Sequence, residues 1–298
     1  ELRLVLKESN TSNMAFEMIN SIETKISNFC DVYDGINPGS KELKDVFINT
    51  QKLTHSKKVI DGKDFNKFTP IEWSGIYVQY DENLVELERN KLKKIGKPFT
   101  ARIIKKTNFF EKNKVITRQT SDTIIATLDE VGYYTKNSVH STLIKKEYKN
   151  ILSLKIICSL YNSKLIDWFY RTKSMESGRL FPQVKIERLN DLPVPSKEIL
   201  INKKLVLELL CSFLLYKYSL KLQEVLDAVV FNLYFPDHMQ EREIDVLQFV
   251  ERDIEKVIQG REFEKLNDTE KEQVIEQLHQ TWSHPDSEVR NRIKLFAV

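Results

Sequence analysis

The sequence contains little glycine, and its glycines do not form a nucleotide-binding motif. Only eight glycines occur in 298 residues, and the only close pair is Gly35 and Gly39. The chain therefore has neither the G-x-G-x-x-G turn of dinucleotide-binding folds nor the phosphate loop of P-loop NTPases. None of the eight prolines are adjacent, so the chain also lacks the Pro-Pro-aromatic loop with which adenine-modifying enzymes grip a flipped base. These absences argue against a catalytic nucleotide-binding module here.

Cysteine and long apolar runs are also scarce. The three cysteines, Cys30, Cys158 and Cys211, are far apart and odd in number. This favours neither a disulfide framework nor a zinc site, and it suggests a reducing, cytoplasmic setting. The most apolar stretch, residues 205–222, contains three charged side chains, so we expect no membrane span. The first residues show neither a signal-peptide pattern nor an initiating Met, and we interpret the chain as a piece of a longer protein.

Side chains that could form a catalytic or metal site are not grouped by any motif. His279 and His284 are the only histidines near one another, and their spacing matches no common metal motif. Residues 42–44 and 61–63 fit the acid-x-Lys pattern of some nucleases, but with 43 acidic residues chance alone supplies several such triplets. We therefore predict no catalytic residue and no metal site in this chain. A self-contained nuclease that uses Asp61 and Lys63 is kept as an alternative.

Charge is nearly balanced overall but unevenly distributed. The chain has a net charge of +3. Residues 97–195 contain 18 basic and 9 acidic side chains, whereas residues 236–298 contain 9 basic and 15 acidic ones. Residues 1–96 and 196–235 are close to neutral. The basic central segment is typical of a surface that faces a polyanion.

Hydrophobic periodicity and turn residues divide the chain into three regions. Residues 1–96 form a lead-in region, residues 97–195 a basic core, and residues 196–298 a helical C-terminal region. Helices are predicted within residues 1–30 and at 82–94, 151–161, 165–171, 203–233, 241–258 and 268–281. Strands are predicted within residues 46–80 and at 99–104, 114–120 and 123–128. The expected fold class is α+β, with a mixed β-rich recognition core, flanking helices and a mostly helical C-terminal part.

Cationic and amide side chains in the basic core are the candidates for nucleic-acid contacts. Lysine and arginine on strands can contact phosphates, and arginine, glutamine and asparagine can form the paired hydrogen bonds that distinguish guanine or adenine. The candidates are Arg102, Lys105, Lys106, Lys112, Lys114, Arg118, Gln119, Lys136, Asn137, His140 and Lys145. Arg118, Gln119 and Asn137 are the expected base readers in the major groove. Alternatively, any single lysine belongs to a solvated face with carboxylate partners.

The aromatic pairs Phe109-Phe110 and Tyr133-Tyr134 lie in the same region. They could stack on an unpaired base, although such pairs more often pack in a core or across strands.

Several short segments of the basic core have a characteristic order and spacing: residues 116–122, 124–129, 132–134, 137–140, 160–165, 178–186 and 189–195. They resemble the TaqI-like C-terminal specificity domain. This domain is the target-recognition module of type IIG restriction-modification enzymes and related adenine-specific DNA methyltransferases, so the resemblance implies that residues 97–195 are a DNA target-recognition core. Residues 32–39 and 75–80 look like the lead-in that follows the catalytic domain in those enzymes. Within residues 178–186, we expect Pro182 to bend the chain, and Val184 and Ile186 to face inward from a strand.

The resemblance implies a division of labour within a longer parent chain. A preceding domain would bind S-adenosylmethionine and methylate adenine, sometimes with a Mg-dependent nuclease further upstream, while this part selects the DNA sequence. No cofactor is then expected in this chain itself. The expected partners are double-stranded DNA and the catalytic methyltransferase domain of the parent, with no membrane. The acidic tail and residues 203–233 leave a helical protein-protein adaptor as the alternative.

Overall fold

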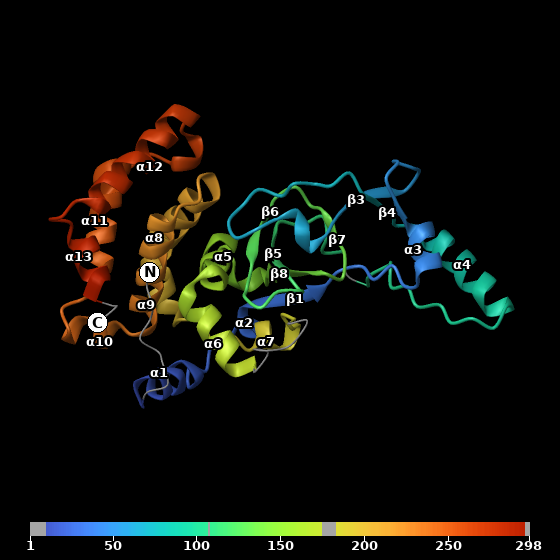
Figure 1. Cartoon of the computed structure of the whole chain (residues 1–298), viewed down its shortest axis with the longest axis horizontal. Coiled ribbons are helices and arrows are strands. Elements are labelled where there is room, and N and C mark those ends of the chain that lie inside the picture. The colour runs from blue at the N-terminus through green and yellow to red at the C-terminus, as the bar shows by residue number, and fades with distance from the viewer. Residues whose placement is uncertain (1–9, 107, 175–182, 296–298) are drawn as a thin grey trace. The chain divides into compact units, whose positions relative to one another are not determined.

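The computed structural model describes residues 10–106, 108–174 and 183–295, which divide into two compact units. The β-unit contains residues 30–144 and 183–190 of the described chain, and the helical unit contains the rest. Figure 1 shows the elements of both units. The predicted α+β class is confirmed, because helices predominate and strands form two small sheets. The two units cut across the three predicted regions, whose functional division stays a prediction.

The first sheet of the β-unit is antiparallel throughout and has the strand order β1-β8-β5-β6. Its central strand β5 is buried on both faces, because four of its five residues, beginning with Lys114, are buried. The last residue of β5, Arg118, is half-buried and lies at one end of the sheet. The strands are β1 (Cys30–Asp34), β5 (Lys114–Arg118), β6 (Ala126–Asp129) and β8 (Val139–Ile144).

The second sheet has the order β2-β4-β3-β7, with β3 and β7 parallel. Val59, Val78, Phe110 and Tyr134 form part of its core, which α3 and α4 extend. The predicted helix at 82–94 is confirmed as α4, and Asp81 caps it by accepting hydrogen bonds from two backbone N–H groups. The elements are β2 (Ile48–Asn49), β3 (Ser56–Ile60), β4 (Tyr77–Gln79), β7 (Tyr134–Thr135), α3 (Lys41–Phe47), α4 (Glu82–Lys94) and the short helix η1 (Gly62–Asp64).

Two strand predictions in this unit are wrong. Residues 99–104 form no strand, and only Arg102 makes an isolated bridge, to Asn37. Val184 is buried as expected, but Ile186 begins the helix α7 (Ile186–Asn190) rather than continuing a strand. The bend predicted at Pro182 lies outside the described residues.

The helical unit is built from helices packed around a large apolar core. The single helix predicted at 203–233 is two helices, because Ser219 caps a new helix by accepting a hydrogen bond from the Leu222 N–H. The helix predicted to begin at residue 268 is confirmed, and Asn267 caps it in a capping box with Glu270. The elements are α1 (Asn10–Asn20), α2 (Ile26–Phe29), η2 (Lys146–Tyr148), α5 (Leu154–Asn162), α6 (Lys164–Ser174), α8 (Lys197–Tyr216), α9 (Leu220–Tyr234), α10 (Pro236–Glu241), α11 (Leu247–Ile258), η3 (Phe263–Lys265), α12 (Asp268–Ser283) and α13 (Glu288–Leu295). Among the described helices, none is long and apolar enough to cross a bilayer.

Candidate nucleic-acid interface

The three expected base readers lie at one end of the first sheet. Arg118 pairs in register with Val139 at the start of β8. The next residue, Gln119, donates its backbone N–H to Ser138 O over 2.8 Å, so Gln119 lies beside the turn that contains Asn137. Asn137 is exposed, and Arg118 and Gln119 are half-buried. The structure therefore brings together side chains that are about twenty residues apart in the sequence.

A fourth polar residue, Asn66, joins this group through Arg118. The Arg118 guanidinium donates to Asn66 Oδ1 over 2.8 Å and to the Phe65 carbonyl, and it lies 5.8 Å from the centre of the Phe65 ring. A Cβ on Gly62 would come within 3.1 Å of Ser138 O and 3.6 Å of Arg118 Cγ, so glycine leaves room for this arrangement. We call the surface formed by Asn66, Arg118, Gln119 and Asn137 the polar edge.

An ion pair holds the two loops of the polar edge together. Asp61 accepts hydrogen bonds from Ser138 Oγ at 2.8 Å and Lys136 Nζ at 3.1 Å. Burial opposes ionisation of Asp61, but the hydrogen bonds from Ser138 and Lys136 outweigh it and lower the pKa of this carboxyl group. Lys136 is thus a partner of Asp61 that fixes the loop, and its side chain is 12% exposed. Asp61 is likewise engaged in this structural contact.

Lys114 and His140 are too deeply buried to contact DNA, and their prediction as contacts needs correcting. Lys114 is fully buried and forms an ion pair with Asp129 on the neighbouring strand. Burial lowers the pKa of the Lys114 ammonium, and the Asp129 carboxylate acts in the opposite direction. His140 is 2% exposed, and its Nε2 donates to Val184 O over 2.8 Å. Burial lowers the pKa of His140 as well, which favours the neutral ring.

The remaining candidates differ in how available they are. Arg102, Lys106 and Lys112 are exposed. Lys105 is 15% exposed and lies 3.1 Å from Asp34 Oδ1, so its charge is already partnered. Lys145 belongs to the helical unit, where its ammonium donates to Ser27 O over 2.7 Å.

The aromatic pairs pack in the protein rather than presenting a stacking platform. Phe109, Phe110 and Tyr134 are at most 4% exposed. The rings of Phe110 and Tyr134 stack with centroids 4.5 Å apart, and those of Phe109 and Tyr33 do the same at 4.5 Å. Tyr133 is half-buried against the cluster that contains Ile116 and Val139. Core packing is therefore their role in this structure.

The comparison with protein families identifies this part of the chain. Residues 57–194 match the family model of the TaqI-like C-terminal specificity domain. This part of the chain is therefore similar to that domain, and we call residues 57–194 the specificity domain. The match covers slightly less than half of the 298 residues and includes the whole polar edge. No curated protein matches the chain.

The family match begins earlier in the sequence than the predicted recognition core. The match starts in β3, so η1, β4 and α4 belong to it although residues 57–96 were assigned to the lead-in region. Asn66 was missed for this reason, and because 52 residues separate it from Arg118 no local pattern could reveal their contact. Exposed Lys63 and Lys185 are further side chains of the specificity domain that the prediction did not include.

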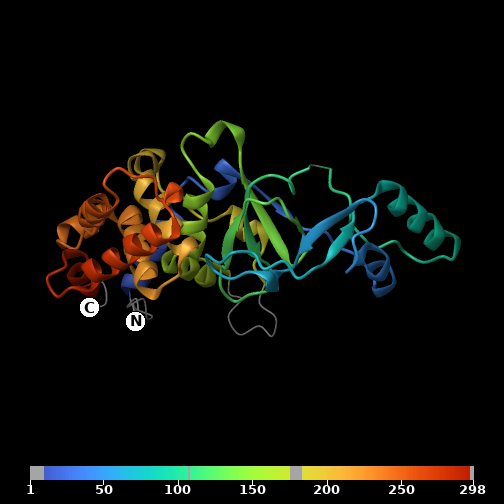
Figure 2. The ribbon, with the colours of Figure 1, turned by 90° about the horizontal axis from the view of Figure 1, so that it is seen from above.

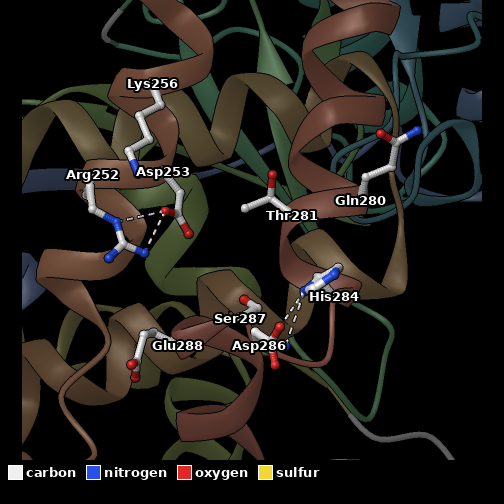
Figure 3. A pocket seen from close by; sticks show the side chains of 9 residues that line it. All are labelled: Arg252, Asp253, Lys256, Gln280, Thr281, His284, Asp286, Ser287 and Glu288. Carbon is white, nitrogen blue, oxygen red and sulfur yellow. Dashed lines mark hydrogen bonds and ion pairs between the residues drawn. The ribbon is translucent and has the colours of Figure 1, made fainter.

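A hollow in the helical unit lies outside the specificity domain. Figure 3 shows its lining side chains, which surround a volume of about 440 Å³. Two pairs of its lining groups contact one another: Arg252 donates to Asp253 Oδ1 over 2.9 Å, and His284 lies 3.7 Å from Asp286. Trp282 Nε1 also donates to Asp253, at 3.3 Å. Among the described residues, no group of three His, Cys, Asp or Glu side chains is arranged to hold a metal ion.

Proposed function

We propose that this chain selects the DNA sequence on which a restriction-modification enzyme acts. The observation that carries the proposal is the match to a specificity domain whose residues include the polar edge. Such a domain implies DNA sequence recognition. The arginine and amide side chains gathered at the polar edge have the hydrogen-bonding groups that read guanine and adenine in a major groove.

The parent enzyme, in this proposal, is an adenine-specific DNA methyltransferase of the type IIG class. S-adenosylmethionine would be bound by its catalytic domain, and this chain would supply double-stranded DNA binding. The proposal rests on the family resemblance. The nuclease alternative gains no support, because Asp61, the acid it would use, forms an ion pair with Lys136.

The helical unit would attach the specificity domain to the catalytic domain of the parent. One face of α8 supports this role, because Ile201 and Leu205, one helical turn apart, are 55% and 65% exposed. Leu220 at the start of α9 is 75% exposed. Large exposed apolar side chains on one helix are typical of protein contact sites. The same observation supports the adaptor alternative, which predicts a protein partner and no DNA binding.

The test is selection of preferred sites from a random duplex library, followed by binding measurements on the site that is recovered. Replacing Arg118 or Gln119 by alanine should relax the preference at particular base pairs by about 1–3 kcal/mol each. The matched control is Lys185→Ala, which removes an exposed charge and should weaken binding to all sequences alike. Failure of the wild-type chain to enrich any site would refute the proposal, and so would unaltered base preference in both polar-edge variants.

A further inference from the structure

A run of basic residues without any acidic residue begins within α4. Residues 89–106 contain eight basic and no acidic side chains, between Glu88 on one side and Glu111 on the other. The boundary predicted at residue 96 divides this run, so the charge of α4 did not count toward the basic core. We call the first five of these cations the α4 tip: Arg89, Lys91, Lys93, Lys94 and Lys97.

The α4 tip is exposed, and its pairing is weak. The side chains of Lys91 and Lys97 are 59% and 57% exposed. Arg89 and Lys91 pair with glutamates three residues earlier, and Lys97 lies 3.6 Å from Glu42. Such surface pairs contribute about 1 kcal/mol or less and exchange readily with other anions. Within the part of the chain that the structure describes, no ion pair is found for Lys93 or Lys94.

The apolar face of α4 packs against the core of the second sheet, so the backbone that bears the cations is held in place. Val85 is 7% exposed, and Leu84 and Leu92 pack beside it on the core of the second sheet. The Arg89 guanidinium lies 5.1 Å from the centre of the Phe99 ring. Lysines in the last turn also complement the helix dipole, which explains some of them without any ligand. That effect does not reach Lys97 or the cations that follow it.

The basic run leads from the α4 tip back to the polar edge. Figures 1 and 2 both show α4 at the end of the β-unit, beyond the second sheet as seen from the first. Further along the run, Arg102 exchanges backbone hydrogen bonds of 2.7 and 3.2 Å with Asn37. Ile36, the residue before Asn37, accepts a 2.8 Å hydrogen bond from the Asn137 N–H through its carbonyl. The run occupies the last six residues of α4, about 9 Å of helix, and continues beyond it, so it provides cations over several phosphate spacings of a duplex.

We propose that the α4 tip is a second contact surface for the DNA backbone, beyond the bases read at the polar edge. The proposal rests on the proposed function and extends it. DNA is favoured over an acidic protein because this surface lies within the specificity domain, and because the same basic run continues to Arg102, whose backbone partner Asn37 follows the residue that bonds Asn137. Contacts at the α4 tip would add affinity and fix orientation without adding sequence preference.

The test compares two triple variants of the whole chain. Lys91, Lys93 and Lys94 are replaced by glutamine in the first, and the exposed lysines Lys256, Lys265 and Lys294 of the helical unit in the control. Binding to a selected duplex and to a scrambled duplex of equal length is followed by fluorescence anisotropy from 50 to 200 mM salt.

Losing three phosphate contacts should reduce the slope of log K against log salt by about 2.7. Over this fourfold range, the wild-type chain would lose about 40-fold more affinity than the α4 variant. The reduction should be equal on both duplexes and absent in the control. A variant slope within about 0.5 of the wild type would overturn the proposal, as would a loss confined to the selected duplex, or binding of an acidic polypeptide with the same dependence on the three lysines.

Two further measurements keep the result interpretable. If the α4 variant melts at a lower temperature, Lys97→Gln with Arg102→Gln removes two cations outside the helix, and a slope reduction of about 1.8 is expected. If the wild-type chain binds the selected and scrambled duplexes equally, while the α4 variant still has a reduced salt slope, the proposed function alone would be refuted. If the wild-type chain prefers the selected duplex, but the α4 variant has the same salt slope as the wild type, this inference alone would be refuted.

Discussion

Lys112 and Lys114 are two residues apart, and the structure predicts opposite consequences for their replacement. Lys112 is exposed, whereas Lys114 is fully buried and paired with Asp129. Lys114 also donates to the Phe110 carbonyl, so its ammonium joins β5, β6 and the loop that precedes β5. Lys114→Met keeps the side-chain length and removes these contacts.

The magnitude follows from what is left behind in the core. Removing one partner of a buried ion pair costs about 3–5 kcal/mol, because the other charge stays buried without compensation. Asp129 keeps three hydrogen bonds from the backbone N–H groups of residues 131–133, at 2.9–3.1 Å. These bonds retain part of its stabilisation, so we expect a loss near the lower limit, about 3 kcal/mol. Lys112→Met should change stability by about 0.5 kcal/mol or less.

Amide hydrogen exchange is the suitable assay, since it reports on β5 and β6 separately from the helical unit. A loss of about 3 kcal/mol corresponds to roughly 150-fold faster exchange of the most protected amides in these strands. In DNA binding, Lys112→Met should reduce the salt slope by about 0.9 if its ammonium contacts a phosphate. Unchanged exchange in Lys114→Met, together with a reduced salt slope, would refute the structural role assigned to Lys114.

Three further changes test other parts of the β-unit. Gly35→Ala should destabilise by about 3 kcal/mol or more in urea denaturation, because a Cβ would lie 2.0 Å from Lys136 O. Asp61→Asn should cost about 1–2 kcal/mol in the same assay, because it weakens the hydrogen bonds from Ser138 and Lys136. Burial holds the pKa of His140 below 6.5, so the unfolded chain binds more protons just below that pH. Stability should therefore fall as the pH drops through 6.5, and His140→Gln should show a smaller drop in Tm between pH 7.5 and 5.5.

The sequence predicted best those helices whose first residue follows a side chain that can cap the helix. Asp81 and Asn267 cap α4 and α12, which begin at the predicted residues 82 and 268. The break between α8 and α9 was missed because neither glycine nor proline marks residues 217–219, and apolar residues continue on both sides. Residues 99–104 have strand-like composition, but only Arg102 lies against a partner backbone. A strand-like composition is therefore not sufficient, because a strand forms only where a neighbouring strand can pair with it.

The candidate site shows the same limit. The expected base readers Arg118, Gln119 and Asn137 do lie together, because the end of β5 pairs with the start of β8. Lys114 was misassigned because a charged residue in a strand normally marks the solvent face. The central strand β5 is covered on both faces, so the alternation that would reveal exposure does not apply to it.

Net charge alone is a poor guide to which cations are available for a phosphate. Within the basic core, Lys105, Lys114 and Lys136 are each matched by an aspartate that is distant in sequence, and these pairs organise the strands and loops. The cations of residues 89–106 have few such partners among the described residues, and most of them are exposed. Because only an exposed and weakly paired cation can release counterions from DNA, the phosphate-facing surface should be centred nearer α4 than the charge of residues 97–195 indicates.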